Sequence, residues 1–283
     1  MPGPILAAPV QTERRADLIR LDSRAIITDM FAVRVAAWTL CLVALAVPPA
    51  HAQLTVAAAS DLQTVLPVIA ERFQHTERVP VRISYGSSGQ FVTQIQNKAP
   101  FDLFLSADDA YITALVMSGH ADGSTVVPYA TGRLALWTRA DRGIDTRRGL
   151  AALTDARIHS LSIANPAHAP YGRAAVEALQ RMGLYEQLRQ RIVMGENVSQ
   201  AAQFAQTGNA DAAIIALSLT MAPAMRSVGA AVEIPVDAFS PIRQAGVVIR
   251  GTSRAEQARR LLAFLTTPDI ATLLLNAGFG APR

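Results

Sequence analysis

The chain has 283 residues, of which 26 are basic and 22 acidic, and its formal net charge at pH 7 is only +4. So small a charge, without a run of Lys or Arg, excludes an obvious nucleic-acid-binding face. Cys41 is the single cysteine and lies in the N-terminal segment, so the rest of the chain can form neither a disulfide framework nor a cysteine-ligated metal site.

The first 52 residues have the pattern of an export signal. Residues 35–47 are apolar, and the Ala-His-Ala sequence that ends at Ala52 matches a signal-peptidase site. The apolar stretch is shorter than the roughly 20 residues that a membrane helix needs. The sequence therefore predicts cleavage after Ala52 and a periplasmic mature protein that begins at Gln53. Residues 1–29 precede Met30, an alternative start of translation, and are excluded from the predicted fold.

From Gln53 onward, short apolar runs typical of strands alternate with segments of helical periodicity. The expected strands are residues 54–58, 79–85, 101–105, 133–137, 161–163, 212–215 and 246–249. Ser60 is a candidate N-cap of the first helix, which is expected to make one short turn and restart at Pro67, because proline is tolerated in a first turn. This alternation predicts an α/β fold whose mostly parallel sheets are flanked by helices.

Two stretches, 133–137 and 234–248, are expected to cross between the two halves of this fold. The crossings divide the mature chain into two lobes. Lobe 1 is expected to comprise residues 53–133 and 238–283, and lobe 2 residues 134–237. Residues 1–52 form the leader and signal peptide in this division.

Four turns that follow strands and open helices are rich in small and polar residues. They are Ala-Ala-Ala-Ser at 57–60, Tyr-Gly-Ser-Ser-Gly at 85–89, Asn-Pro-Ala-His-Ala-Pro-Tyr-Gly at 165–172 and Glu-Asn-Val-Ser-Gln at 196–200. Helix N-termini offer free N–H groups and partial positive charge, and in α/β sheets they gather at the carboxyl ends of the strands. One terminus contributes only about 0.3–1 kcal/mol, so several must converge to hold a buried anion. The four turns together predict such a site.

At these turns the chain resembles the molybdate-binding proteins of ABC transporters, within the type II periplasmic solute-binding fold. The resemblance spans residues 53–283 and implies two lobes, each a mostly parallel sheet flanked by helices, joined by crossover strands. Matched residue by residue, it implies Ser60 and Ser88 as oxyanion ligands from lobe 1, and Tyr171 and the backbone N–H of Val198 from lobe 2. The chain departs from some members at Ala216, where they have a tyrosine, so Tyr171 is expected to supply that hydroxyl.

The function that this resemblance implies is capture of molybdate, and of tungstate as a near-isosteric ligand, for delivery to the membrane permease and ATPase of an ABC importer. It implies a monomer that binds no nucleic acid. It also implies no catalytic residue, no cofactor and no directly bound cation, since molybdenum is held as its oxyanion.

Two other functions remain open from the residues alone. Sulfate or another tetrahedral oxyanion could occupy the same site, depending on its size. A secreted serine hydrolase using Ser88 is the more distant alternative, because the sequence has neither Gly-x-Ser-x-Gly spacing nor a well-placed histidine base.

Carboxylates are not expected to face the bound anion, because they would repel it. Asp102, Asp108 and Asp109 are therefore expected to cap helices or to face solvent. With no carboxylate among the candidate ligands, the O–H that phosphate retains at neutral pH would find no acceptor, at a cost of about 1–3 kcal/mol. The sequence thus predicts that phosphate is rejected.

Overall fold

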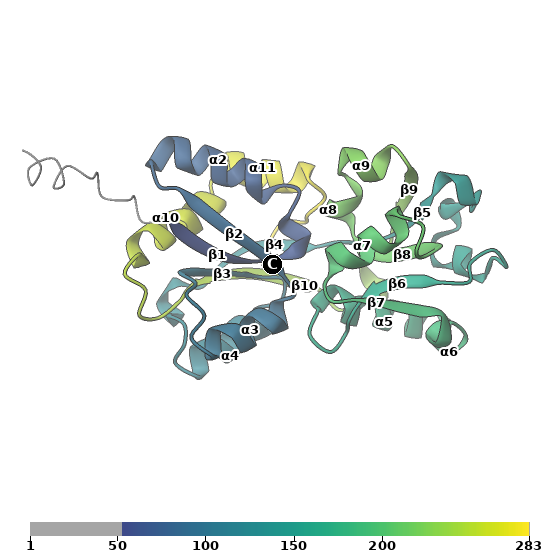
Figure 1. Ribbon diagram of the computed structural model, residues 1–283, viewed down its shortest axis with the longest axis horizontal. Coiled ribbons are helices and arrows are strands. Elements are labelled where there is room, and N and C mark those ends of the chain that lie inside the picture. Colours follow the sequence, from purple (N-terminus) through teal and green to yellow (C-terminus); the bar gives the residue numbers. More distant parts are fainter. Residues whose placement is uncertain (1–52, 283) are drawn as a thin grey trace, which may run out of the picture. The chain divides into compact units, whose positions relative to one another are not determined.

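The computed structural model describes residues 53–282, which form two five-stranded sheets with helices packed on them (Figure 1). The predicted signal segment and its cleavage site lie outside the described residues. Within residues 53–282, no helix has both the length and the apolar character needed to cross a membrane.

The first sheet contains strands from both ends of the described chain. Its order is β2 (Val81–Gly86), β1 (Leu54–Ala59), β3 (Leu103–Ser106), β10 (Ile242–Val248) and β4 (Val127–Gly132). β1 pairs in parallel with β2 and β3, whereas β10 runs antiparallel to β3 and β4. The sheet is therefore mixed, with the returning strand β10 inserted between β3 and β4.

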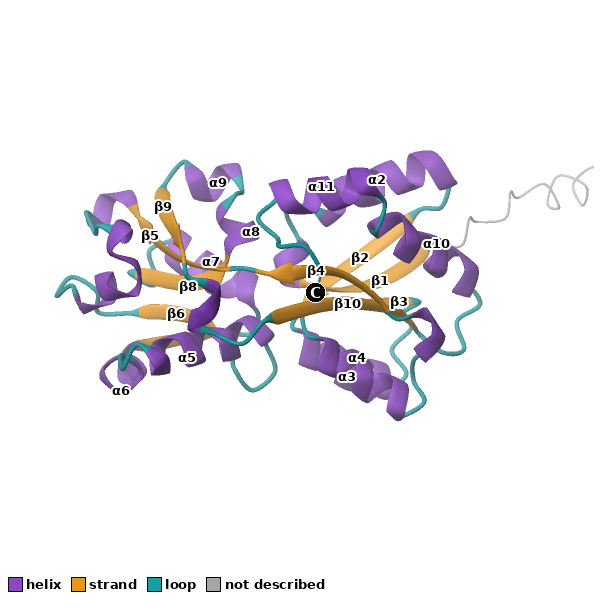
Figure 2. Ribbon diagram, turned by 180° about the vertical axis from the view of Figure 1, so that it is seen from behind, coloured by secondary structure: helices purple, strands orange, loops and turns teal. Residues whose placement is uncertain are grey.

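Helices cover both faces of this sheet because alternate strand residues point to opposite sides. Val56 and Ala58 belong to one apolar cluster with α2 (Leu66–Glu77), α10 (Ala255–Leu265) and α11 (Pro268–Asn276). Ala57, between them, belongs to another cluster with α3 (Ser88–Gln96) and α4 (Asp109–Met117). The two helix layers lie on opposite sides of the strands (Figure 2).

The second sheet is built from the middle of the chain. Its order is β7 (Ile192–Gly195), β6 (Leu161–Ala164), β8 (Ala212–Ala216), β5 (Leu134–Arg139) and β9 (Gly229–Glu233). β6 is parallel to β7 and β8, and β5 is antiparallel to β8 and β9. Its helices are α5 (Pro170–Arg181), α6 (Tyr185–Leu188), α7 (Val198–Gln206), α8 (Leu217–Thr220) and α9 (Pro223–Arg226). Short 3₁₀ segments occupy Ser60–Leu62, Gly123–Thr125, Ala140–Arg142, Thr146–Thr154, Arg189–Arg191 and Val236–Ala238.

The α/β class with two helix-flanked sheets is confirmed, and each of the seven predicted strands overlaps an observed one. The sheets are less parallel than expected, because two of the four pairings in each are antiparallel. The predicted two-step helix start is also confirmed, with a 3₁₀ turn at Ser60–Leu62 and Pro67 in the first turn of α2. Ser60 as an N-cap is wrong, since Ala59 holds the cap position and no side chain caps the turn.

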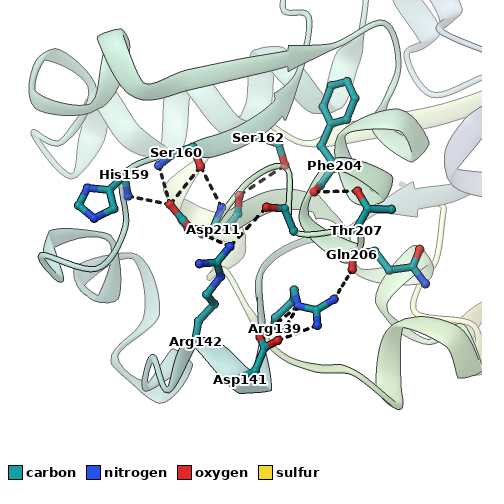
Figure 3. Close-up of polar contacts among 12 residues, drawn as sticks. Arg139, Asp141, Arg142, His159, Ser160, Ser162, Phe204, Gln206, Thr207 and Asp211 are labelled. Carbon is teal, nitrogen blue, oxygen red and sulfur yellow. Dashed lines mark hydrogen bonds and ion pairs between the residues drawn. The ribbon is translucent and has the colours of Figure 1, made fainter.

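A buried carboxylate, Asp211, stabilises the second sheet at the start of β6 (Figure 3). Its Oδ2 accepts hydrogen bonds from the backbone N–H groups of His159, at 2.8 Å, and Ser160, at 3.0 Å. Its Oδ1 lies 3.2 Å from Nη2 of Arg142. Burial raises the pKa of Asp211, but these hydrogen bonds and the nearby guanidinium outweigh it and hold the pKa below its usual value. The carboxylate thereby links the strand β6 to the chain that enters β8.

Replacing Asp211 by alanine is expected to lower the free energy of unfolding by about 2–3 kcal/mol, because buried N–H groups would lose a charged acceptor. The matched control is Asp141→Ala. The Asp141 side chain is 60% exposed, so its ion pair with Arg139 should contribute under about 1 kcal/mol. Because the folded pKa of Asp211 is lowered, its contribution is present above its ordinary pKa of 3.8 and is lost as the pH falls through the folded value. Urea unfolding of both variants measures the difference, and equal losses would contradict this role.

Candidate functional site

The four candidate ligands Ser60, Ser88, Tyr171 and Val198 line one small cavity at the carboxyl ends of strands from both sheets. The centre of a water-sized sphere can move through only about 10 Å³ of this space, roughly the room that one small molecule needs. The remaining wall is made of Ala59, Asp61, Gly86, Ser87, Ala107, Ala169 and Pro170. A larger hollow between α2 and β2 lies on the outer surface of the first sheet and contains none of the candidate ligands.

Three helices begin at the cavity. The first residues of α3, α5 and α7 are Ser88, Pro170 and Val198, and all three line the wall. First-turn N–H groups have no partner within their own helix, and each helix carries partial positive charge at this end. The three helix ends therefore contribute partial positive charge to the cavity, whose wall contains no Lys or Arg.

The cap of α7 leaves the N–H of Val198 unused. Asn197 Oδ1 accepts from the N–H of Ser199 at 3.1 Å and of Gln200 at 3.0 Å. Val198 is the first helical residue, which the cap skips. Its amide is thus a hydrogen-bond donor at the cavity wall.

The hydroxyls of Ser88 and Ser60 are both buried and both accept hydrogen bonds from backbone amides. Ser88 Oγ accepts from the N–H of Ala107 at 3.0 Å, and Ser60 Oγ accepts from that of Ser199 at 3.4 Å. A hydroxyl has one hydrogen to give in addition to its acceptor lone pairs. Each serine can therefore donate its hydrogen to a group in the cavity while its oxygen is held in place.

Tyr171 lines the cavity, but its hydroxyl is engaged by other side chains. It donates to Asp61 Oδ2 at 3.0 Å and lies 3.1 Å from Nε2 of Gln244. Burial, and then the charge of Asp61, raise the pKa of the Tyr171 hydroxyl well above its usual value, so this group stays protonated. Its hydroxyl hydrogen points to Asp61, which leaves the first-turn N–H of Tyr171 as its other donor.

Asp61 is the wall residue that the sequence reasoning missed. It is fully buried, and burial raises the pKa of its carboxyl to about 6, against the lowering effect of hydrogen bonds from Gln244 and Tyr171. The premise of the phosphate argument, a wall without a carboxyl group, is therefore wrong. Its place directly after Ser60, just beyond the end of β1, is a local signal for its position but not for the burial of its carboxyl group.

The aspartates considered from the sequence lie outside the cavity wall. Asp108 caps α4 as expected, accepting from the N–H of Ala110 at 2.9 Å. Asp102 neither caps a helix nor faces solvent, because it is buried and accepts hydrogen bonds from Thr55 and Thr252. It joins the start of β1 to the chain that follows β10.

Side chains from the two sheets meet around the cavity. Ser87 Oγ lies 2.8 Å from His168 Nδ1, and Gln90 Nε2 donates to Glu196 Oε2 at 2.7 Å. Arg173 of α5 forms an ion pair with Asp108, the N-cap residue of α4, which packs on the first sheet. The described conformation therefore encloses the cavity with residues from both halves of the fold.

These contacts also bear on the hydrolase alternative. The serine in contact with a histidine is Ser87, whereas the oxygen of Ser88 accepts from a backbone amide. The third member of such a triad would be Glu196, whose Oε2 lies 3.7 Å from His168 Nε2, beyond hydrogen-bond distance. The geometry needed for a nucleophile at Ser88 is not present.

Ala216, where some similar proteins have a tyrosine, ends β8 and is fully buried outside the cavity wall. Two residues later, Ser218 Oγ donates to the backbone oxygen of Asp61 at 2.8 Å. This segment thus positions the turn that carries Ser60 and Asp61, and it brings no hydroxyl to the cavity itself.

Residues 54–280 match the family model of bacterial extracellular solute-binding proteins. The chain is 34% identical over 248 residues to the molybdate-binding protein ModA of Rhodobacter capsulatus, covering 87% of this chain and 96% of that relative. It is also 34% identical over 229 residues to ModA of Azotobacter vinelandii, covering 81% and 90% respectively.

Two solved structures show how widely the fold is shared. The Azotobacter vinelandii periplasmic molybdate-binding protein superposes with a TM-score of 0.76 at 30% identity, covering 82% of this chain and all (100%) of that one. The sulfate-binding protein of Mycobacterium tuberculosis superposes with a TM-score of 0.68 at 16% identity, covering 80% and 86%. The second likeness is evidence of the fold alone.

Proposed function

The chain belongs to the bacterial extracellular solute-binding protein family, and from this premise we propose that it captures molybdate in the cavity between its two sheets. It is a binding protein of a transport system and not an enzyme. The observation that carries the choice of ligand is the convergence of three helix N-termini and two serine hydroxyls on a wall without a cationic side chain. Such a wall suits a compact dianion that accepts many hydrogen bonds.

We assign the direct contacts to four residues. Ser60 and Ser88 donate their hydroxyl hydrogens, and Val198 donates its backbone N–H. Tyr171 contributes from the first turn of α5, with its hydroxyl held by Asp61. These contacts come from both halves of the fold, so the bound anion bridges them.

The lobe boundaries follow from the same account. Lobe 1 comprises residues 53–133 and 238–283, and lobe 2 residues 134–237. Support comes from the sheets, since β4 and β5 are separated by Arg133 alone and the chain returns between β9 and β10. Closure on the anion is a hinge motion about these two crossings.

The protein acts in the periplasm as a monomer, after export and cleavage behind Ala52. It delivers molybdate to the membrane permease and ATPase of an ABC importer. The relatives at 34% identity that are named molybdate-binding proteins support this assignment.

Molybdate and tungstate are expected to raise the melting temperature more than sulfate, and phosphate completes the series of four anions. Molybdate and tungstate are similar in size, whereas the shorter S–O bonds of sulfate cannot reach donors spaced for the longer Mo–O bonds. At a concentration a hundred times Kd, a ligand adds about 2.7 kcal/mol, which corresponds to roughly 5–10 °C for a chain of this size.

A thermal-shift series with the four anions at matched ionic strength tests this order. Sodium chloride at the same ionic strength is the control for general salt effects. A larger shift with sulfate than with molybdate would assign the site to sulfate, and no shift with any oxyanion would contradict the proposed function.

A further inference from the structure

One oxygen in the cavity wall has no hydrogen-bond partner. Asp61 is fully buried, and its Oδ2 accepts from the hydroxyl of Tyr171 at 3.0 Å and from Nε2 of Gln244 at 2.5 Å. Its Oδ1 is also buried, yet nothing in residues 53–282 donates to it. A buried carboxyl oxygen without a donor is unfavourable while the group is ionised, and it can hydrogen-bond to an anion only if it carries a proton.

No cationic side chain of residues 53–282 forms an ion pair with Asp61. On α5, Arg173 pairs with Asp108 and Arg181 with Glu177, and on β10 Arg243 is exposed. The helices α7 and α8 contain no charged residue. The tyrosines Tyr171 of α5 and Tyr129 of β4 are buried, and their pKa values are raised well above the usual range by burial first and then by Asp61 itself. β2 brings Tyr85, whose pKa burial raises to about 12, and Arg82, which is exposed. An ionised Asp61 would therefore meet an incoming dianion without any screening cation.

On the basis of the proposed function, we propose that Asp61 takes up one proton from solvent when molybdate binds and that its neutral carboxyl donates the Oδ1–H to the anion. The bond that forms is O–H on Asp61, and the anion enters as a dianion. Oδ2 already accepts two hydrogen bonds, so the proton is placed on Oδ1. The carboxyl then changes from a group that only accepts into one that donates.

The empty site already favours this change. Burial raises the pKa of Asp61 to about 6, although hydrogen bonds from Gln244 and Tyr171 lower it. A dianion in contact with the carboxyl raises the pKa further, because like charges disfavour ionisation. Above pH 6, Asp61 is mostly ionised in the protein without ligand and protonated in the complex. Affinity is therefore expected to fall about tenfold for each pH unit in that range.

The protonation state of Asp61 also determines how the site meets phosphate. An ionised Oδ1 can accept the O–H that phosphate retains at neutral pH, whereas a protonated carboxyl would face that O–H with a second donor.

Titration calorimetry with sodium molybdate at about pH 8, in buffers of different ionisation enthalpy, measures the protons taken up per anion. The wild type is expected to take up about one. Asp61→Asn places an N–H where the protonated carboxyl would present its O–H, so it is expected to take up none. Because this variant needs no protonation step, it should bind up to about a hundredfold more tightly than the wild type at pH 8, with little pH dependence.

Asp109→Asn is the matched control, since Asp109 lies in the first turn of α4 and does not line the cavity. It should still take up one proton per anion. Binding by the wild type without proton uptake overturns this inference and leaves the proposed function standing. Uptake that persists in Asp61→Asn places the proton on another group and also overturns it. Absence of molybdate binding by the wild type at every pH removes the proposed function and this inference together.

Discussion

Replacing Val198 by proline is expected to weaken molybdate binding by at least a hundredfold while leaving the fold intact. Proline has no N–H, so the variant loses a hydrogen bond to a charged group, which contributes about 1.5–3 kcal/mol. Its ring carbon also occupies the place of the donor hydrogen and prevents close approach of the anion. At about 1.4 kcal/mol for each factor of ten, the lost hydrogen bond alone accounts for ten- to a hundredfold.

The helix should tolerate this change because Val198 is the first residue of α7, a position where proline is favoured. The preceding residue, Asn197, has φ −150° and ψ 175°, within the extended region that a residue before proline adopts. Val198→Ala is the control, since it shortens the side chain and keeps the N–H. Calorimetry should therefore separate the two variants. Equal affinities in Val198→Pro and Val198→Ala would contradict an amide contact at this position.

The double variant Ser60→Ala/Ser88→Ala is expected to bind molybdate about a hundred to ten thousand times more weakly than the wild type. Each hydroxyl contributes a hydrogen bond to a charged group, and each single variant should lose ten- to a hundredfold. The two losses need not add, because both groups bind the same anion. Comparison of the single and double variants by calorimetry gives the coupling between them.

The neighbouring serine provides the control for this pair. Ser87 also lines the cavity, but its Oγ is engaged with His168 at 2.8 Å and caps α3. Ser87→Ala should lower the free energy of unfolding by about 1 kcal/mol, because the helix loses its cap. It should change the affinity for molybdate much less than Ser88→Ala does. If Ser87→Ala weakened molybdate binding more than Ser88→Ala did, the anion would lie closer to Ser87 than we propose.

Much of the fold could be predicted from the sequence because its strands are short, apolar and separated by helical periods. β4, β7 and β9 were not predicted. β4 contains Pro128 and the polar Thr131, and its antiparallel pairing with β10 depends on a strand more than a hundred residues away. β7 and β9 are the two edge strands of the second sheet and are only partly buried, unlike the predicted interior strands β6 and β8.

The candidate ligands could be predicted because each lies in a local pattern, a strand end followed by a helix start. Asp61 could not, because its role depends on distant partners. Tyr171 and Gln244, which bind its carboxyl, are 110 and 183 residues away in the sequence. Burial of this aspartate arises only when α5 and β10 meet the end of β1. Local spacing predicted the candidate donors and missed the carboxyl group in the same wall.

The measurement that tests the central claim most directly is a crystal structure of the protein grown with molybdate, with anomalous data collected above and below the molybdenum absorption edge. The account predicts one strong molybdenum peak in the cavity, with oxygens of the anion within hydrogen-bond distance of Ser60 Oγ, Ser88 Oγ and the N–H of Val198. A molybdenum peak elsewhere in the molecule, or an empty cavity at saturating molybdate, would contradict it.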